Sequence, residues 1–169
     1  MRVSLALIVI VLTITVSHLT AAANLDANQT ADETAIKEVI ADRFLAGWNT
    51  HDAHIFASAF APDADFTNVR GVRVSGRESI EKFHVQAFEQ MFMQSHQTAE
   101  VIRIRFLKAD IAMVDVRWEM TGALSPAGMS RPVRTGLLDL VFTSSGRGWL
   151  IAVMHNVDLT PVSASPASK

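Results

Sequence analysis

The first strong pattern along the chain is helical. Between residues 31 and 47 the apolar positions recur three or four residues apart: Ile36, Val39, Ile40, Phe44 and Leu45. This spacing places them on one side of a helix, and two acidic residues precede them where the positive helix start favours negative charge. The pattern predicts a helix that begins at Ala31 and ends at Gly47.

Two further helices are expected before the strands begin. Asp52 is a suitable N-cap for a short second helix, which Pro62 should stop. A third helix is predicted over residues 77–93, because its apolar positions again follow helical spacing. His84 shares that apolar side and therefore should face inward.

A strand is predicted over residues 65–69, and Gly71 and Gly76 bracket a short extended piece that would complete a hairpin with it. The rest of the chain alternates between apolar and polar positions, as strands do. Four more strands are expected at 102–107, 112–121, 133–143 and 149–157.

Helices at one end and strands at the other predict an α+β domain, in which three N-terminal helices cover one face of a single curved sheet. Such a curved sheet would leave a cone-shaped cavity beneath the helices, and this cavity is the default ligand site. A fully packed interior is the alternative.

The first residues have the layout of a secretory signal. Met1-Arg2 precede an apolar run of about 14 residues, which is shorter than the ~18 to 20 needed to span a bilayer, and three alanines end at Ala23. We expect a signal over 1–23, a spacer over 24–30, one domain over 31–159 and a disordered tail over 160–169. The protein would then be exported, periplasmic or secreted, with no stable membrane anchor after cleavage.

The amino-acid composition excludes some classes of binding partner. The chain has no cysteine, so its fold must rest on packing alone. Loss of Arg2 with the signal would change the formal net charge from −2 to −3, and no cluster of Lys or Arg exceeds a pair. Nucleic acid and anionic membrane surfaces need a concentrated basic patch, so we expect neither as a partner.

Several short motifs occur in a particular order. They are Trp48-Asn49-x-x-Asp52, the segment 63–69, the helix start Gly76-Arg77-x-x-Ile80, the following His84, and Trp149 with His155-Asn156 on the last strand. This order resembles the nuclear transport factor 2-like superfamily, and more narrowly the SnoaL-like, SgcJ/EcaC type of small domain. The resemblance covers residues 31–159.

The resemblance implies a cone-shaped α+β barrel with a mixed or antiparallel sheet, and a homodimer formed through the outer sheet face. Its members use the pocket for cyclisation, isomerisation, dehydration, binding or assembly, so the fold leaves the function open. SgcJ/EcaC relatives often carry the label oxidoreductase, yet the chain has no glycine-rich dinucleotide turn and no cysteine pair. The spacing of His51, Asp52 and His54 matches no standard metal set, so we expect neither a cofactor nor a metal.

His84 is the first candidate for catalysis, because an imidazole can pass a proton either way near pH 7. The alternative is a core histidine satisfied by one hydrogen bond. Asp65 could orient or activate this imidazole from the cone mouth, or could serve as a turn acceptor. Asn68 could hold a carbonyl oxygen, or could stabilise the turn before Gly71.

His155 and Asn156 are adjacent on the last strand, so only one of them can face the pocket. Parity with Trp149, Ile151 and Val153 favours His155 as the inward and catalytic residue, and leaves Asn156 a weaker claim. The ligand-binding wall is expected from residues whose alternative role is simply core packing: Trp48, Asn49, Phe56, Phe60, Phe88, Phe92, Trp118 and Met120.

Two functions remain open from the sequence. One is an enzyme in which a carboxylate and His84 move a proton on a small carbonyl compound, without any cofactor. The absence of tyrosine and cysteine excludes a phenol-based oxyanion hole and thiolate catalysis. The other is a non-catalytic module that binds a small apolar ligand or dimerises.

Overall fold

The computed structural model describes residues 28–146 and 148–159. The predicted signal and tail lie outside these residues, as do the first four positions of the expected spacer. Residues 28–35 are helical, which is three residues earlier than the expected start at Ala31, and they belong to a first compact unit. The second unit begins at Ile36 and holds the rest of the described chain. Among the described helices none has the length and apolar content to cross a membrane.

The helix of the second unit continues past Gly47. Its wide π-helical turns form η1 (Ile40–Leu45), and α2 (Ala46–Asn49) follows directly. The expected helix end at Gly47 is therefore two residues too early. Gly47 does not end the helix, but a side chain at this position would clash with the next helix. A Cβ there would lie 2.2 Å from the backbone nitrogen of Phe56. The missing side chain lets α2 pack directly against the next helix.

The turn after α2 reverses the chain in two residues. His51 adopts a left-handed conformation with φ 56°, and the amides of His51 and Asp52 bind the carbonyls of Trp48 and Gly47 at 3.1 and 2.9 Å. This is the usual hydrogen-bond pattern of a helix end with a left-handed residue. Asp52 then caps α3 (Ala53–Ser58), as predicted, by accepting a bond of 2.9 Å from the amide of Ile55.

The predicted hairpin is confirmed, with different bounds. Strand β1 (Phe60–Thr67) begins before the expected position and contains Pro62, which therefore does not stop α3. Strand β2 (Arg73–Ser75) pairs with it in the antiparallel direction. Helix α4 (Arg77–Glu89) follows and ends four residues earlier than predicted.

The remaining four strands form the antiparallel meander that the sequence predicts. They are β3 (His96–Lys108), β4 (Ile111–Thr121), β5 (Arg134–Ser145) and β6 (Gly148–Asp158). The order across the sheet is β2-β1-β6-β5-β4-β3, and β1 runs parallel to β6 while all other neighbours are antiparallel. The result is one mixed, six-stranded sheet.

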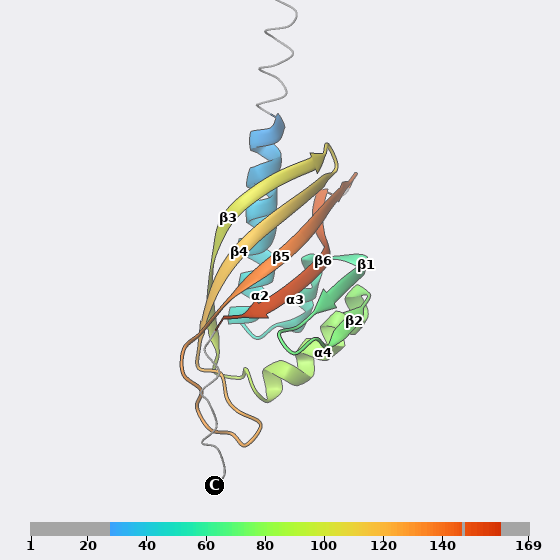
Figure 1. Cartoon of the computed structure of the whole chain (residues 1–169). Coiled ribbons are helices and arrows are strands. Elements are labelled where there is room, and N and C mark those ends of the chain that lie inside the picture. Colours follow the sequence, from blue (N-terminus) through green and yellow to red (C-terminus); the bar gives the residue numbers. More distant parts are fainter. Residues whose placement is uncertain (1–27, 147, 160–169) are drawn as a thin grey trace, which may run out of the picture. The chain divides into compact units, whose positions relative to one another are not determined.

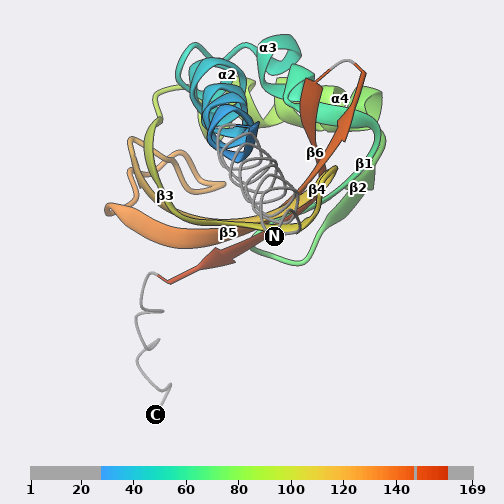
Figure 2. The ribbon, with the colours of Figure 1, turned by 90° about the horizontal axis from the view of Figure 1, so that it is seen from above.

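The sheet is strongly curved along β3, β4 and β5 (Figure 1). Viewed from above, the helices α2, α3 and α4 lie on its concave side (Figure 2). The expected α+β fold, with helices covering one face of a curved sheet, is confirmed. Its largest fully buried side chains come from both layers: Phe44 and Phe56 from the helices, and Phe60, Trp118, Phe142 and Ile151 from the sheet.

An irregularity in β6 decides which of its side chains face inward. Phe142 of β5 lies opposite Ile151, whereas its neighbour Val141 lies opposite Val153, so Ala152 is an extra residue. Such a bulge shifts the alternation of faces by one position. Ile151 and Met154 are consequently both buried, although they are three residues apart.

Gly136 allows an aromatic side chain to cross the sheet. Trp118 of β4 lies opposite Gly136 of β5, and a Cβ on this glycine would lie 2.2 Å from the indole ring. The indole instead passes over the glycine, and its Nε1 donates a hydrogen bond of 2.9 Å to Oδ1 of Asn156 on β6. One side chain thus connects three strands on the concave face.

We expect Gly136→Ala to destabilise the protein by about 1 to 3 kcal/mol, because the added methyl group must displace Trp118. Urea unfolding followed by tryptophan fluorescence measures this change. Gly146→Ala is the matched control, since a Cβ there has nothing within 4 Å, and we expect a change within about 0.5 kcal/mol. Equal stability of the two variants would contradict the proposed role of Gly136.

Candidate ligand-binding pocket

A cavity of about 410 Å³ lies between the helices and the concave face of the sheet. Its wall is mainly aromatic, with residues from η1, α2, α3, β1, α4 and β4: Phe44, Trp48, Phe56, Phe66, Phe83, Phe92 and Trp118. Edge and tilted contacts join several of these rings, for example Trp48 and Phe92 at 5.0 Å between centroids. The cavity is therefore not filled by the aromatic side chains that surround it.

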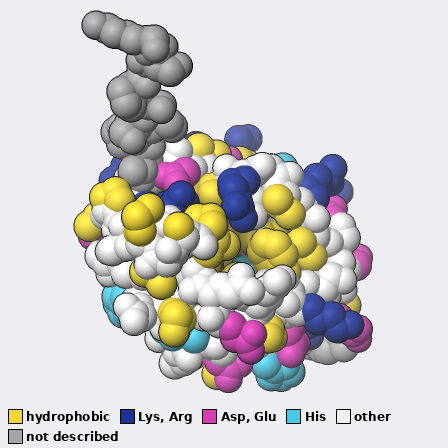
Figure 3. All heavy atoms as spheres, turned by 90° about the horizontal axis from the view of Figure 1, so that it is seen from below, with side chains coloured by type: hydrophobic (Ala, Val, Ile, Leu, Met, Phe, Trp, Pro, Cys, Tyr) yellow, Lys and Arg dark blue, Asp and Glu magenta, His cyan; other side chains and the backbone are white. Residues whose placement is uncertain are grey.

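The exposed lining residues belong to two loops. Arg70 lies in the turn between β1 and β2, whereas Pro126 and Arg131 lie in the connection between β4 and β5. Seen from below, hydrophobic side chains gather around a hollow, with basic side chains beside it (Figure 3). The rim of the pocket thus carries positive charge.

His84 lies on the inner side of α4, as predicted, and is only 2% exposed. Its ring packs against Phe56 at 4.1 Å and Phe66 at 5.0 Å between centroids. Nδ1 is 2.8 Å from the carbonyl oxygen of Ile80, one turn earlier. Because a carbonyl oxygen only accepts, Nδ1 carries the hydrogen in the neutral ring, and Nε2 is left as an acceptor.

Burial lowers the pKa of His84 from 6.5 to about 4, since desolvation disfavours the charged imidazolium; the hydrogen bond with Ile80 acts weakly in the opposite direction. The side chain is consequently neutral at pH 7.

Asp65 does not face this imidazole. Its neighbours Ala64 and Phe66 are buried, so alternation along β1 turns Asp65 to the other face, and it does not line the pocket. The carboxylate accepts a short hydrogen bond from the hydroxyl of Ser75 on β2. The expectation that Asp65 points into the cone mouth is wrong, because the hairpin partner supplies its hydrogen bond.

His155 is exposed and lies outside the pocket, whereas Asn156 lines it. The prediction that His155 faces inward is wrong. It assumed that side chains alternate between the two faces without interruption from Trp149 onward, whereas the bulge at Ala152 shifts this alternation by one residue. The structure therefore does not bring the three predicted catalytic residues together. Only His84 faces the cavity.

The predicted wall is correct for most of its members. Those that line the cavity are Trp48, Phe56, Asn68, Phe92, Trp118, Met120 and Asn156. Phe60 and Phe88 are buried core residues that do not reach it. Asn68 lines the rim, but its Oδ1 accepts bonds from the amides of Arg70 and Val72 at 2.9 and 3.0 Å, so the proposed turn role is present as well.

Asn49 does not line the pocket but holds a residue that does. Its Nδ2 donates to the backbone oxygen of Gln97 at 2.9 Å, and its Oδ1 accepts from the amide of Gln97 at 2.8 Å. Next to it, Nε1 of Trp48 donates to the hydroxyl of Ser95 at 3.1 Å. These bonds attach the end of α2 to the start of β3 and close one side of the cavity.

Five polar lining residues escaped the sequence prediction: Arg70, Gln97, Arg131, Arg134 and Asp158. Arg134 is only 6% exposed, and its Nε and Nη2 donate to Oδ2 of Asp158 at 3.0 and 2.5 Å. Its guanidinium also lies over the ring of Trp118 at 5.7 Å. Parity with the buried Leu138 and Leu140 could have placed Arg134 inward, whereas Gln97 precedes the strand that the pattern predicts.

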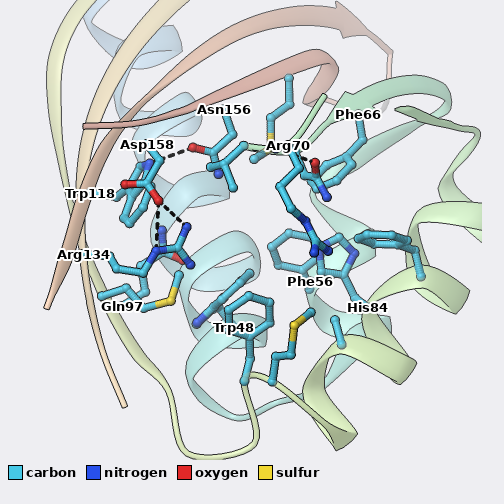
Figure 4. A pocket seen from close by; sticks show the side chains of 18 of the residues that line it. Trp48, Phe56, Phe66, Arg70, His84, Gln97, Trp118, Arg134, Asn156 and Asp158 are labelled. Carbon is cyan, nitrogen blue, oxygen red and sulfur yellow. Dashed lines mark hydrogen bonds and ion pairs between the residues drawn. The ribbon is translucent and has the colours of Figure 1, made fainter. Parts of the chain in front are cut away.

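The polar groups occupy two sides of the cavity (Figure 4). His84 lies on one side among Phe56 and Phe66, and the side chain of Arg70 points into the cavity on that side. Arg134 and Asp158 lie on the other, with Trp118 and Gln97. Among the described residues, no group of three His, Asp or Glu side chains could hold a metal ion.

A comparison with known families matches residues 41–155 to the SnoaL-like domain. The chain belongs to this family. This SnoaL-like protein is similar to a domain of unknown function with a cystatin-like fold from Nostoc punctiforme, with 27% identity, a TM-score of 0.69 and coverage of 79% of this chain and 80% of that one. An uncharacterized protein from Caulobacter vibrioides with a cystatin-like fold is 25% identical, with a TM-score of 0.70 and coverage of 78% and 92%.

A hexachlorocyclohexane dehydrochlorinase, LinA type 2, shares the fold of the SnoaL-like protein at 16% identity. Its TM-score is 0.69, and the match covers 85% of this chain and 99% of that one. No curated protein is matched by the chain. The narrower SgcJ/EcaC resemblance stays a prediction.

The low pKa of His84 makes the stability of the SnoaL-like domain depend on pH. The unfolded chain takes up a proton near pH 6.5, whereas the native histidine does so only near pH 4. Stability is therefore fully present above pH 6.5 and is lost as the pH falls toward 4. Between pH 7.5 and 5.0 we expect the free energy of unfolding of the wild type to fall by about 2 kcal/mol more than that of His84→Gln. A shift of one pKa unit corresponds to about 1.36 kcal/mol.

Urea unfolding at the two pH values measures this difference. His155→Gln is the control, because it removes an exposed histidine and should keep the pH dependence of the wild type. Parallel pH dependence of the wild type and His84→Gln would contradict the lowered pKa.

Proposed function

We propose that the protein binds a compact, largely apolar aromatic molecule in this cavity, and that His84 accepts a hydrogen bond from a hydroxyl or N–H group of that molecule. This proposal rests on the neutral imidazole of His84, which lies at the aromatic wall of the cavity. Nδ1 is occupied by Ile80, so the acceptor Nε2 is the atom left for a ligand.

The size and surface of the cavity support this choice. A volume of about 410 Å³ falls within the usual range for small-molecule sites, roughly 300 to 1,000 Å³. Aromatic rings on several sides offer edge and face contacts to a flat ligand.

Binding is favoured over the proton transfer expected from the sequence. Asp158 is the one acid among the described lining residues, and it is engaged by Arg134 on the side opposite His84. His84 therefore has no carboxylate to stabilise its protonated form. With a pKa of about 4 the imidazole is a weak base at pH 7, but it remains a good hydrogen-bond acceptor.

Two matched probes test this proposal. We expect 2-naphthol to bind about 2- to 10-fold more tightly than 2-methoxynaphthalene, since only the former donates a hydrogen bond worth roughly 0.5 to 1.5 kcal/mol. The preference should disappear in His84→Phe and persist in His155→Gln. Isothermal titration calorimetry measures the affinity of each probe for the three proteins, and failure of both probes to bind the wild type would refute the proposal.

A second candidate is acid–base chemistry on a small carbonyl compound. Arg70 favours it, because its side chain points into the cavity on the side of His84 and could face a developing enolate oxygen (Figure 4). In this scheme Nε2 of His84 takes a proton from the carbon beside the carbonyl, the enolate forms, and the same proton or one from solvent returns. The similar dehydrochlorinase supports the fold as a host for proton abstraction, at the level of fold alone.

This candidate predicts enzyme-catalysed exchange of the protons beside the carbonyl of 1-tetralone in heavy water. Mass spectrometry would detect deuterium uptake above the rate without protein, and His84→Gln and Arg70→Gln should each remove the excess. Binding of 1-tetralone without faster exchange would leave binding as the function.

We also propose that the protein acts after export and as a homodimer. The signal layout of residues 1–23 supports export, and exposed apolar residues such as Ile102, Leu107 and Val157 support association through the sheet. Expression of the full chain should yield a mature protein that starts near Asn24 and sediments as a dimer. An intact N-terminus or a monomer would contradict the respective proposal.

A further inference from the structure

The side of the cavity opposite His84 has a chemistry of its own. Building on the proposed function, we propose that Gln97 and Arg134 bind a neutral ligand group in which an N–H or O–H donor stands next to a carbonyl oxygen, as in a carboxamide. The ligand would then be an apolar ring system that carries this group at one end.

The first observation is an unpaired buried atom. Gln97 is 3% exposed and lines the cavity, and its Oε1 is buried without a hydrogen-bond partner in the part of the chain that the structure describes. Buried polar atoms are nearly always paired, since an unpaired one loses its bonds to water without replacement. A donor group on a ligand would supply the missing partner.

The second observation is that Gln97 is held in place. Its backbone amide and carbonyl are both bound by the side chain of Asn49, at 2.8 and 2.9 Å. The side chain therefore begins from a backbone position that two helix-to-strand hydrogen bonds determine. A group held in this way can accept a ligand bond with little further loss of freedom.

The third observation is the position of Arg134. Gln97 lies opposite Met120, and Met120 lies opposite Arg134, so the three residues form a row across β3, β4 and β5. With neighbouring strands about 4.8 Å apart, the Cα atoms of Gln97 and Arg134 are roughly 10 Å apart. Both side chains line the cavity, so one small planar group could contact both.

The charge of Arg134 selects a neutral group. Two of its N–H donors are directed at Asp158, and no other hydrogen bond of the Arg134 side chain is found among the described residues. Further donors are therefore available to a carbonyl oxygen. Since Asp158 already balances the guanidinium, a carboxylate at this end of the cavity would meet a second carboxylate, and the other lining cations, Arg70 and Arg131, belong to the two rim loops. A carboxamide brings the carbonyl without that charge.

The indole ring of Trp118 forms a flat wall beside the site that Gln97 and Arg134 make. Its ring is fixed by the bond from Nε1 to Asn156, and the guanidinium of Arg134 lies over it. The remaining apolar part of the ligand would extend toward the aromatic wall and His84, across the cavity in Figure 4.

Three naphthalene derivatives test this inference by calorimetry on the wild-type protein. They are 2-naphthamide, which has the donor and the carbonyl, methyl 2-naphthoate, which lacks the donor, and 2-naphthoate, which is charged. We expect 2-naphthamide to bind at least 5-fold more tightly than either of the others. The preference over the ester should be lost in Gln97→Leu and retained in the neighbouring control Thr98→Val, whose side chain is exposed.

Thermal unfolding first establishes that each variant is folded, and Gln97→Met replaces Gln97→Leu if the latter is not. Equal affinity for the amide and the ester, a preference that survives loss of the Gln97 amide, or tighter binding of 2-naphthoate would each overturn the inference. If 2-naphthol still binds through His84 in that case, the proposed function stands alone. If no naphthalene compound binds, the proposed function fails as well.

Discussion

The pocket depends on one aromatic side chain that crosses a strand. Trp118 can lie flat on the concave face only because Gly136, its partner on β5, has no side chain. The indole then donates a hydrogen bond to Asn156 on β6, and the guanidinium of Arg134 lies over its ring. Three strands are joined by this contact, and the same contact forms one wall of the cavity. A larger residue at position 136 would change the wall and the orientation of both polar neighbours.

The opposite wall follows from a different constraint. His84 is placed among phenylalanines on the inner side of α4, where a charged imidazolium would lose its hydration. The carbonyl oxygen of Ile80 fixes the orientation of the neutral ring by accepting a hydrogen bond from Nδ1–H. The cavity consequently has an acceptor on one side and a paired arginine with an unpaired glutamine on the other. This asymmetry is the basis for proposing a ligand with polar groups at two ends and an apolar middle.

The SnoaL-like fold by itself does not choose between binding and catalysis, because unrelated activities share it. The choice lies in which polar residues face the cavity and what each already binds. In this protein the predicted carboxylate, Asp65, accepts a hydrogen bond from Ser75 outside the pocket, and the lining carboxylate, Asp158, is paired with Arg134. The function that we propose, hydrogen bonding to a largely apolar molecule, rests on these partners rather than on the family.

The amino-acid sequence determined the element types and their order along the chain, the Asp52 cap and the inward side of α4, because local periodicity and capping report on neighbouring residues. Most of the aromatic wall could be predicted for the same reason. The face of His155 could not, since the bulge at Ala152 arises from pairing with β5. Nor could the hydrogen bonds between Asn49 and Gln97, which lie 48 residues apart in the sequence. Only tertiary structure decides which polar atoms are paired and which remain for a ligand.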